Sequence, residues 1–187
     1  DETLRQQLDE LRLQQIEALG DLDKETALHA RFVAAFRDYG VDLDAAEITP
    51  ALERMRERRI AEQIASALDD LGRIRRNLFG QQAEEFQRLS ALAMDLDPDP
   101  DRMRLRLAIR DDDLPTMLAF AKPEQLGNLP AGAIWVLSAA LWDRHPQHRP
   151  DVYRMYDQAL FLCPDDYVLQ SIGANIYRFA GRHAAAL

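Results

Sequence analysis

Two histidines and two aspartates stand close enough together in the sequence to suggest a metal site. His145 and His148 lie between Asp143 and Asp151, and zinc and iron both accept imidazole and carboxylate ligands. Pro146 separates the histidines, and the stretch offers no group that would orient either ring. We therefore predict a solvated loop between two helices here, with no metal site and no cofactor site in the chain.

The other reactive groups also have structural explanations. Cys163 is the only cysteine, so the chain can form no internal disulfide. It precedes Pro164 at the expected C-terminal end of a helix, where the helix dipole disfavours a thiolate, and we expect an inert, packed side chain. The aspartates at 97–101 and 111–113 lack the glycine and final glutamate of a calcium loop, so we expect them to cap and break helices. No nucleophile, base and orienting group form a recognisable motif, and we predict no catalytic residue.

Arginines gather at 54–59 and 73–76 and could form a surface for nucleic acid or a phosphopeptide. Acidic residues alternate with them at one-turn spacings: Glu53, Glu57, Glu62, Asp69 and Asp70. This alternation favours ion pairs within one helix on a solvated face. The whole chain carries a net charge of −9, and such a surface repels phosphate backbones. We predict no nucleic-acid partner.

Apolar residues recur at helical spacing along most of the chain, which predicts an all-α fold. At 187 residues and 47% hydrophobic content the chain can form a packed core. No apolar run approaches the ~20 residues needed to span a bilayer. Helices are expected at 2–19, 23–39, 50–79, 82–96, 103–109, 113–121, 131–144, 151–162 and from 165 onward. The alternation at 103–109 would also fit a strand, but no other segment offers that strand a partner.

These helices divide into three expected segments. Residues 1–48 form a helical hairpin or coiled linker, with Gly20 and Gly40 as helix stops and Asp23 as an N-cap. Residues 49–100 form a helical pair that begins at Thr49 and Pro50 and ends at a proline-rich breaker. Residues 101–187 form further repeats, the last of them truncated. Because the chain starts with Asp and stops inside an apolar pattern, we expect an excerpt of a longer protein.

The third segment shows the pattern of tetratricopeptide repeats, which place small residues where two helices cross and a proline about every 34 residues. Pro98 and Pro164 lie two such periods apart, with Ala93 and Ala159 five residues before them. The predicted repeat-packing residues are Ala93, Pro98, Trp135, Ala139, Trp142, Tyr156, Ala159, Pro164, Ala174, Tyr177, Gly181 and Ala186. Ile74 occupies a crossing position that requires a small residue, so 49–100 is at best a divergent or capping unit. We expect tetratricopeptide-like helices to stack as a right-handed superhelix in the second half.

Several short runs resemble one known family. They are residues 8–15 (LDELRLQQ), 34–42 (AAFRDYGVD), 58–71 (RRIAEQIASALDDL), 93–100 (AMDLDPDP), 104–108 (RLRLA) and 129–130 (LP). Together they resemble the region downstream of the kinase domain in large bacterial, eukaryote-like serine/threonine protein kinases, where a linker leads into tetratricopeptide repeats. The resemblance implies a parent chain with an ATP-dependent kinase domain upstream. This chain has no glycine-rich loop, His-Arg-Asp run or Asp-Phe-Gly motif of its own, so no catalytic role transfers to any residue here.

The sequence therefore predicts a non-catalytic scaffold. The first helices of successive repeats would line a concave surface that receives a protein or peptide partner, or a second copy in self-association. The alternative is a purely structural connector between the kinase domain and distal repeats, with the first hairpin as a dimerising stalk. The sequence leaves the partner and the cellular location open.

Overall fold

The computed structural model describes residues 2–18, 21–45, 53, 55–56, 60–80 and 84–179, and within these ranges it contains helices and no strand. The all-α prediction is therefore confirmed. The chain divides into two compact units, Asp1–Asp99 (unit 1) and Pro100–Leu187 (unit 2). The expected boundary near residue 48 falls inside unit 1, and the one near residue 100 falls at the division between the units.

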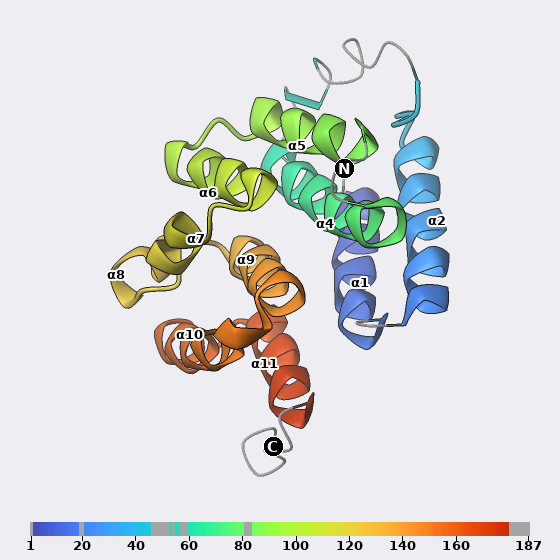
Figure 1. The fold of residues 1–187 in the computed structure, drawn as a ribbon. Coiled ribbons are helices and arrows are strands. Elements are labelled where there is room, and N and C mark those ends of the chain that lie inside the picture. The colour runs from blue at the N-terminus through green and yellow to red at the C-terminus, as the bar shows by residue number, and fades with distance from the viewer. Residues whose placement is uncertain are drawn as a thin grey trace. The chain divides into compact units, whose positions relative to one another are not determined.

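Unit 1 contains α1 (Glu2–Ala18), α2 (Leu22–Asp38), α4 (Ala61–Phe79) and α5 (Glu84–Leu96). Figure 1 shows α1 and α2 as an antiparallel hairpin. Helix α4 packs against both helices of this hairpin and, along much of its length, against α5. Gly72 of α4 faces α5, where an added Cβ would lie 3.5 Å from the ring of Phe86. Unit 1 is thus organised around α4.

The ends of these helices follow local backbone rules. Asp21 caps α2, because its carboxylate accepts the N–H of Lys24 at 3.2 Å. The expected cap, Asp23, lies instead in the first turn, where an acid also suits the helix dipole. Gly40 and Gly80 end α2 and α4 with φ of +86° and +99°, values that favour glycine. The expected stop at Gly20 and start at 49–50 lie outside the described residues.

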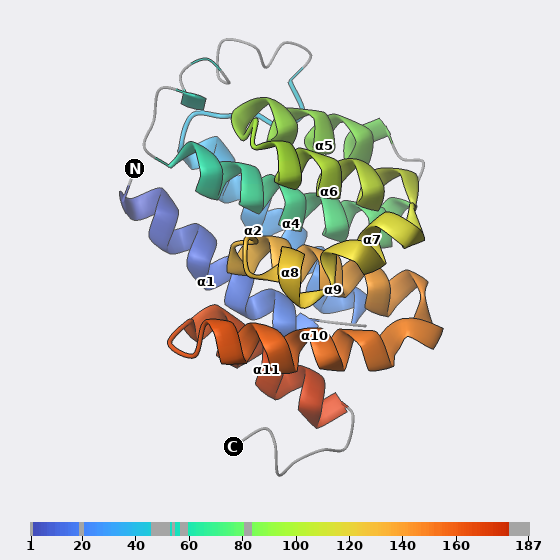
Figure 2. The same cartoon turned by 90° about the vertical axis from the view of Figure 1, so that its left-hand side faces the viewer.

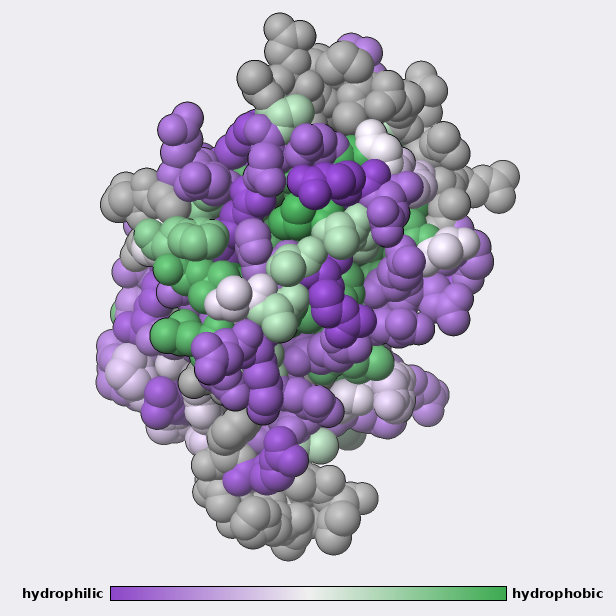
Figure 3. Space-filling view, turned by 90° about the vertical axis from the view of Figure 1, so that its right-hand side faces the viewer, coloured by the Kyte–Doolittle hydropathy of each residue, from purple (hydrophilic) through white to green (hydrophobic). Residues whose placement is uncertain are grey.

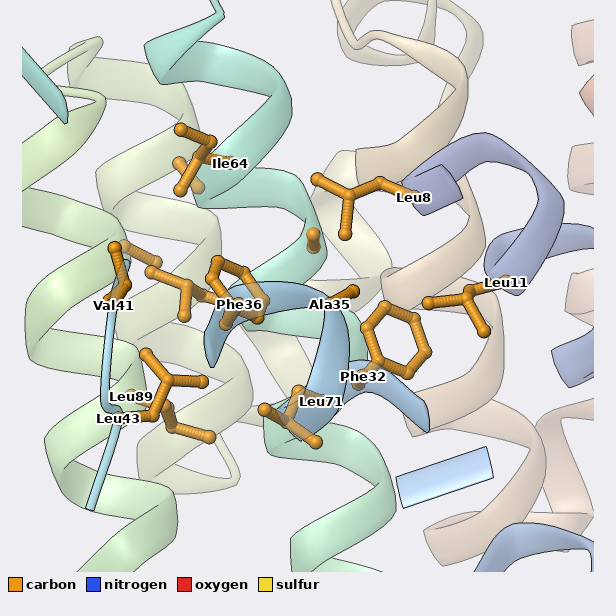
Figure 4. Packing of buried hydrophobic residues seen from close by; sticks show 14 of the residues in the cluster. Leu8, Leu11, Phe32, Ala35, Phe36, Val41, Leu43, Ile64, Leu71 and Leu89 are labelled. Carbon is orange, nitrogen blue, oxygen red and sulfur yellow. The ribbon is translucent and has the colours of Figure 1, made fainter. Parts of the chain in front are cut away.

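The core of unit 1 forms between the hairpin and α4. In Figure 4, Leu8 and Leu11 of α1, Phe32 of α2 and Leu71 of α4 point into the space between the helices. Phe32 and Phe36 are both fully buried. Their i, i+4 spacing therefore places both phenylalanines on the buried face of α2.

Unit 2 contains six α-helices in its described part. They are α6 (Pro100–Asp111), α7 (Leu114–Phe120), α8 (Pro123–Leu126), α9 (Ala131–Arg144), α10 (Arg149–Leu162) and α11 (Tyr167–Phe179), with a 3₁₀ turn at Pro146–His148. Residues 103–109 belong to α6, so the strand alternative is wrong. Asp113 caps α7 by accepting the N–H of Thr116 at 3.2 Å, as predicted for that helix start.

Helix α9 is the central element of unit 2, because α6, α10 and α11 all pack against it. Every residue from Ile134 to Leu141 is buried. Figure 2 shows α11 beside α10, against which it packs. Helix α10 starts at Arg149, two residues earlier than expected, because Pro150 fits the first turn of a helix. Among the described helices of both units, none is long and apolar enough to cross a membrane.

Candidate protein-interaction site

Helix α10 is fixed in unit 2 by one buried stripe. Its buried residues recur at i, i+3, i+4 and i+7: Val152, Met155, Tyr156 and Ala159. The Tyr156 hydroxyl lies 2.9 Å from Oγ of Ser138, and that Oγ also donates to the carbonyl of Trp135 at 2.7 Å. Burial raises the pKa of Tyr156 well above its usual range, so the phenol stays neutral. This buried pair holds α10 against α9.

Helices α10 and α11 pack closely through a glycine. A Cβ on Gly173 would lie 3.1 Å from Cδ1 of Leu160, so the missing side chain lets α11 approach. The Tyr177 hydroxyl donates to the carboxylate of Asp157 on α10. In the turn between these helices, Asp166 accepts the N–H of Leu169 at 3.0 Å. Hydrogen bonds to carboxylates therefore hold both the turn and the contact between the two helices.

Three large apolar side chains point to solvent at this turn. Phe161 is 85% exposed, Leu162 is 47% exposed and Tyr167 is 66% exposed. We call these three residues the turn cluster. Cys163 lies between them and caps α10 by donating its backbone N–H to the carbonyl of Ala159 at 2.9 Å. Aromatic side chains left in water on a fixed turn are the usual anchors of a protein-binding surface.

Of the ten predicted repeat-packing residues that the structure describes, six are buried. Five are at most 3% exposed: Ala93, Trp135, Ala139, Tyr156 and Ala159; Tyr177 is 5% exposed. Ala174 is half-buried, and Pro98 and Pro164 are exposed just after α5 and α10 end. Gly181 and Ala186 lie outside the described residues.

The prediction that Trp142 shares the core with Trp135 needs correction. Trp142 is only half-buried. Its ring makes an edge contact with Tyr153, at 5.8 Å between centroids, and the guanidinium of Arg149 lies 4.6 Å above it. Because Trp142 lies in the last turn of α9, the start of α10 covers it only in part. It forms a cation–π contact at the edge of unit 2 rather than a repeat wedge.

The histidine and cysteine predictions have different outcomes. Nε2 of His145 lies 3.0 Å from Asp112, whereas Nδ1 of His148 lies 2.7 Å from Asp151. The two rings therefore bond to carboxylates on different segments, and no group of three or more metal-ligating residues occurs in the described part of the chain. Cys163 is exposed, so the expectation of a packed side chain is wrong. It follows the last turn of α10 and lies between the residues of the turn cluster.

The prediction for the arginines at 73–76 is also wrong. Arg73, Arg75 and Arg76 are at most 6% exposed, and the ion pairs of Arg73 and Arg75 connect different elements. Arg73 pairs with Glu25 of α2 at 2.9 Å, and both side chains are buried. Arg75 pairs with Asp44 at 2.7 Å. Of the cluster at 54–59, only residues 55 and 56 are described; Arg56 pairs with Asp95 on the surface.

A second buried pair joins α1 to α4. Arg12 donates to Asp70 at 2.8 Å and to the Ser66 hydroxyl at 2.7 Å. Burial lowers the pKa of Arg12, but the charge of Asp70 and the hydrogen bond to it outweigh burial, and the pKa is raised. Arg73 also donates to the Gln15 side chain at 3.3 Å. These groups pair with one another across helices, which is how buried charges fix the register of packed elements.

Sequence reasoning missed Gln15 and Glu25 as members of this polar core. Glu25 lies 48 residues from Arg73, and Gln15 lies 58 residues from it. No local spacing rule connects such positions, so the acids nearest in sequence were the obvious partners.

No family model matches this chain, and neither a curated protein nor a solved structure matches it.

Proposed function

We propose that this chain is a non-catalytic helical scaffold that binds a protein or peptide partner, with α9, α10 and α11 stacked in the tetratricopeptide manner. The buried small residues Ala139 and Ala159 support the repeat packing. The close contact at Gly173 supports it as well, because helices in such a stack must approach one another. The alternative role is that of a rigid connector, which needs no binding surface.

The observation that carries the proposal is the turn cluster. Phe161 and Tyr167 are aromatic, largely solvent-exposed and held at the ends of two packed helices. Burying such side chains in a partner removes apolar area from water at about 25 cal/mol per Å². Residues 134–141 of α9 are already inside the protein, so the binding surface lies at the turn rather than along the first helix of the repeat.

We further infer that the scaffold belongs to a large bacterial serine/threonine protein kinase and acts in signalling. Only the resemblance of the short runs at 8–15, 34–42, 58–71, 93–100, 104–108 and 129–130 supports this inference. The reading frame upstream of Asp1 tests it directly. A glycine-rich loop followed by His-Arg-Asp and Asp-Phe-Gly motifs is expected there. A frame without them removes the kinase from the proposal and leaves the scaffold.

Affinity capture with matched variants tests the binding role. The protein is immobilised as wild type, as Phe161→Ser and as Leu22→Ser, and retained proteins are identified from lysate of the source cells. Leu22 is 62% exposed on α2 of unit 1, so its substitution removes similar apolar area away from the turn. We expect a specific protein to bind wild type and Leu22→Ser. Phe161→Ser should lose it, at a cost of about 2 kcal/mol or more for an aromatic anchor.

The retained protein is then purified and titrated calorimetrically against the same three variants. Equal affinities for all three would contradict the turn cluster as the binding surface. If no protein is retained by wild type, the scaffold role fails and the connector role takes its place. Circular dichroism of Phe161→Ser should match wild type, because the substituted side chain is already in water.

A further inference from the structure

The outer face of the α1–α2 hairpin contains an open groove with two pockets. One has a volume of about 180 Å³ and the other of about 340 Å³. Arg31 lines both pockets and donates a hydrogen bond to Gln14 across the groove. Figure 3 shows the side of the molecule on which α2 lies, where hydrophobic residues form patches among hydrophilic ones. The groove belongs to unit 1 alone.

The two pockets are lined by equivalent positions, seven residues apart on each helix. The smaller pocket is lined by Gln7, Glu10, Leu11, Arg31, Ala34, Ala35 and Asp38; the larger by Gln14, Glu17, Ala18, Lys24, Ala27, Leu28 and Arg31. Adding seven to each α1 position of the first set, and subtracting seven from each α2 position, gives the second set. Seven residues are the repeat of a left-handed coiled coil, in which side chains of one helix enter holes on another. The groove is therefore shaped to receive a helix.

The charges along the groove indicate which helix. The charged residues that line the α1 side are Glu10 and Glu17, and those that line the α2 side are Lys24, Arg31 and Asp38. The α1 side of the groove is therefore acidic, and the α2 side carries both of its cations and one further acid. A hairpin with this pattern is complementary to itself when α1 of one copy faces α2 of another.

We propose that a second copy of this chain docks on the groove, hairpin against hairpin, as an antiparallel four-helix bundle. A two-fold axis along the bundle keeps each residue at the same height as its counterpart. Glu17 then faces Lys24 of the second copy, and Glu10 faces Arg31 of the second copy. Placing α1 against α1 would instead set the two acidic rows against each other, which is unfavourable.

The size and chemistry of the face make this a weak dimer. A 17-residue helix is about 25 Å long, so the interface lies near the lower limit of about 1,200 Å² for specific complexes. Ala27 and Ala34 are exposed and small, which permits close helix approach but contributes little apolar area. The bond between Arg31 and Gln14 forms a central polar layer, a feature that fixes register at a cost in stability. Dimerisation should therefore depend on concentration.

Sedimentation velocity of the full chain over a wide concentration range tests the dimer. Ala34→Glu places a carboxylate in the smaller pocket, facing the acidic row of the second copy. Ala30→Glu is the matched control, because Ala30 is exposed on the same helix but lines neither pocket. Wild type and Ala30→Glu should dimerise with similar constants, and Ala34→Glu should raise the dissociation constant at least tenfold. Both alanines are exposed, and circular dichroism verifies that each variant folds.

Charge reversal tests the arrangement of the helices. Glu17→Lys should weaken the dimer, and adding Lys24→Glu to it should restore the dimer. The proposal is overturned if the chain stays monomeric at every concentration. It is also overturned if the groove binds a helix of another protein while the chain itself stays monomeric. The proposal is overturned as well if Ala34→Glu leaves the dissociation constant of the dimer unchanged, or if Ala30→Glu raises it as much as Ala34→Glu does. A double reversal that fails to restore a dimer weakened by Glu17→Lys overturns the placement of α1 against α2. None of these results bears on the turn cluster of unit 2.

Discussion

Removing Glu25 should destabilise unit 1 severely. Its carboxylate oxygen Oε1 accepts from Arg73 at 2.9 Å and from the Asn77 side chain at 3.2 Å. The side chains of Glu25 and Arg73 are 2% and 1% exposed. Glu25→Ala would therefore remove the carboxylate that pairs with this buried guanidinium, while the Gln15 side chain still accepts from it at 3.3 Å.

The expected loss is about 3–5 kcal/mol in the free energy of unfolding, because a buried charge that loses its partner keeps its full desolvation penalty. A domain of this size has a total stability of about 5–15 kcal/mol. The substitution therefore removes a large share of it. Replacing both members together, as Glu25→Leu with Arg73→Met, removes the charge as well as its partner. That double variant should lie within about 1 kcal/mol of wild type or above it.

Urea unfolding followed by far-ultraviolet circular dichroism measures both effects. Glu85→Ala serves as the matched control, since Glu85 is exposed on α5 of the same unit. The control should unfold at the wild-type urea concentration. If Glu25→Ala also unfolds there, or if the double variant is as unstable as the single one, then the pair is not a coupled buried interaction and the account of the polar core is wrong.

Three further predictions concern single residues. The pKa of His29 should lie below its ordinary 6.5, because burial and the charge of Arg75 outweigh the charge of Asp44. The contribution of His29 to the free energy of unfolding is then fully present above pH 6.5 and is lost as the pH falls below it. An NMR titration of the ring, with unfolding measured at each pH, checks both. Asp112 has φ of +60°, which asparagine tolerates better than alanine; calorimetric melting should show Asp112→Ala to be destabilised more than Asp112→Asn, by about 1 kcal/mol. Gly72→Ala should raise stability by about 0.5–1 kcal/mol in urea unfolding, since its Cβ would meet Phe86 at an ordinary 3.5 Å and alanine favours a helix; a loss would show that α4 and α5 cannot separate slightly.

Local signals predicted the helices well. The glycines that end α2 and α4 adopt the positive φ that glycine alone takes easily, and Asp113 caps α7 as its place before Pro115 suggests. Caps two residues apart, such as Asp21 and Asp23, compete for the same role, and sequence does not decide between them. The turn cluster had a signal that the sequence analysis did not use. Phe161 lies nine residues after Val152, which is two and a half turns, so helical periodicity places it opposite the buried stripe of α10.

The buried arginines of α4 show why the candidate sites were harder to predict than the helices. Every residue from Asp70 to Arg76 is buried, because α1, α2 and α5 all pack against this helix. A helix covered on several sides is normally apolar all round. Here Arg73 and Arg75 occupy such positions, and their partners Glu25 and Asp44 come from α2 and the segment after it. The spacing of charges within one helix cannot distinguish a solvated face from one that other helices cover.

This dependence on α4 leads to a prediction about the first hairpin, which the sequence alone presents as a separate segment at 1–48. Phe32 and Phe36 are fully buried in a cluster that includes Leu71, and the buried Glu25 takes its partners, Arg73 and Asn77, from α4. A fragment of residues 1–48 would expose these aromatic rings, and two short helices without tertiary support are marginal in water. We expect that fragment to lack a cooperative thermal transition by circular dichroism and residues 1–99 to show one. Cooperative melting of 1–48 at low concentration would mean that the hairpin folds without α4. The buried pairs between the hairpin and α4 would then form after the hairpin has folded and would not be needed for it to fold.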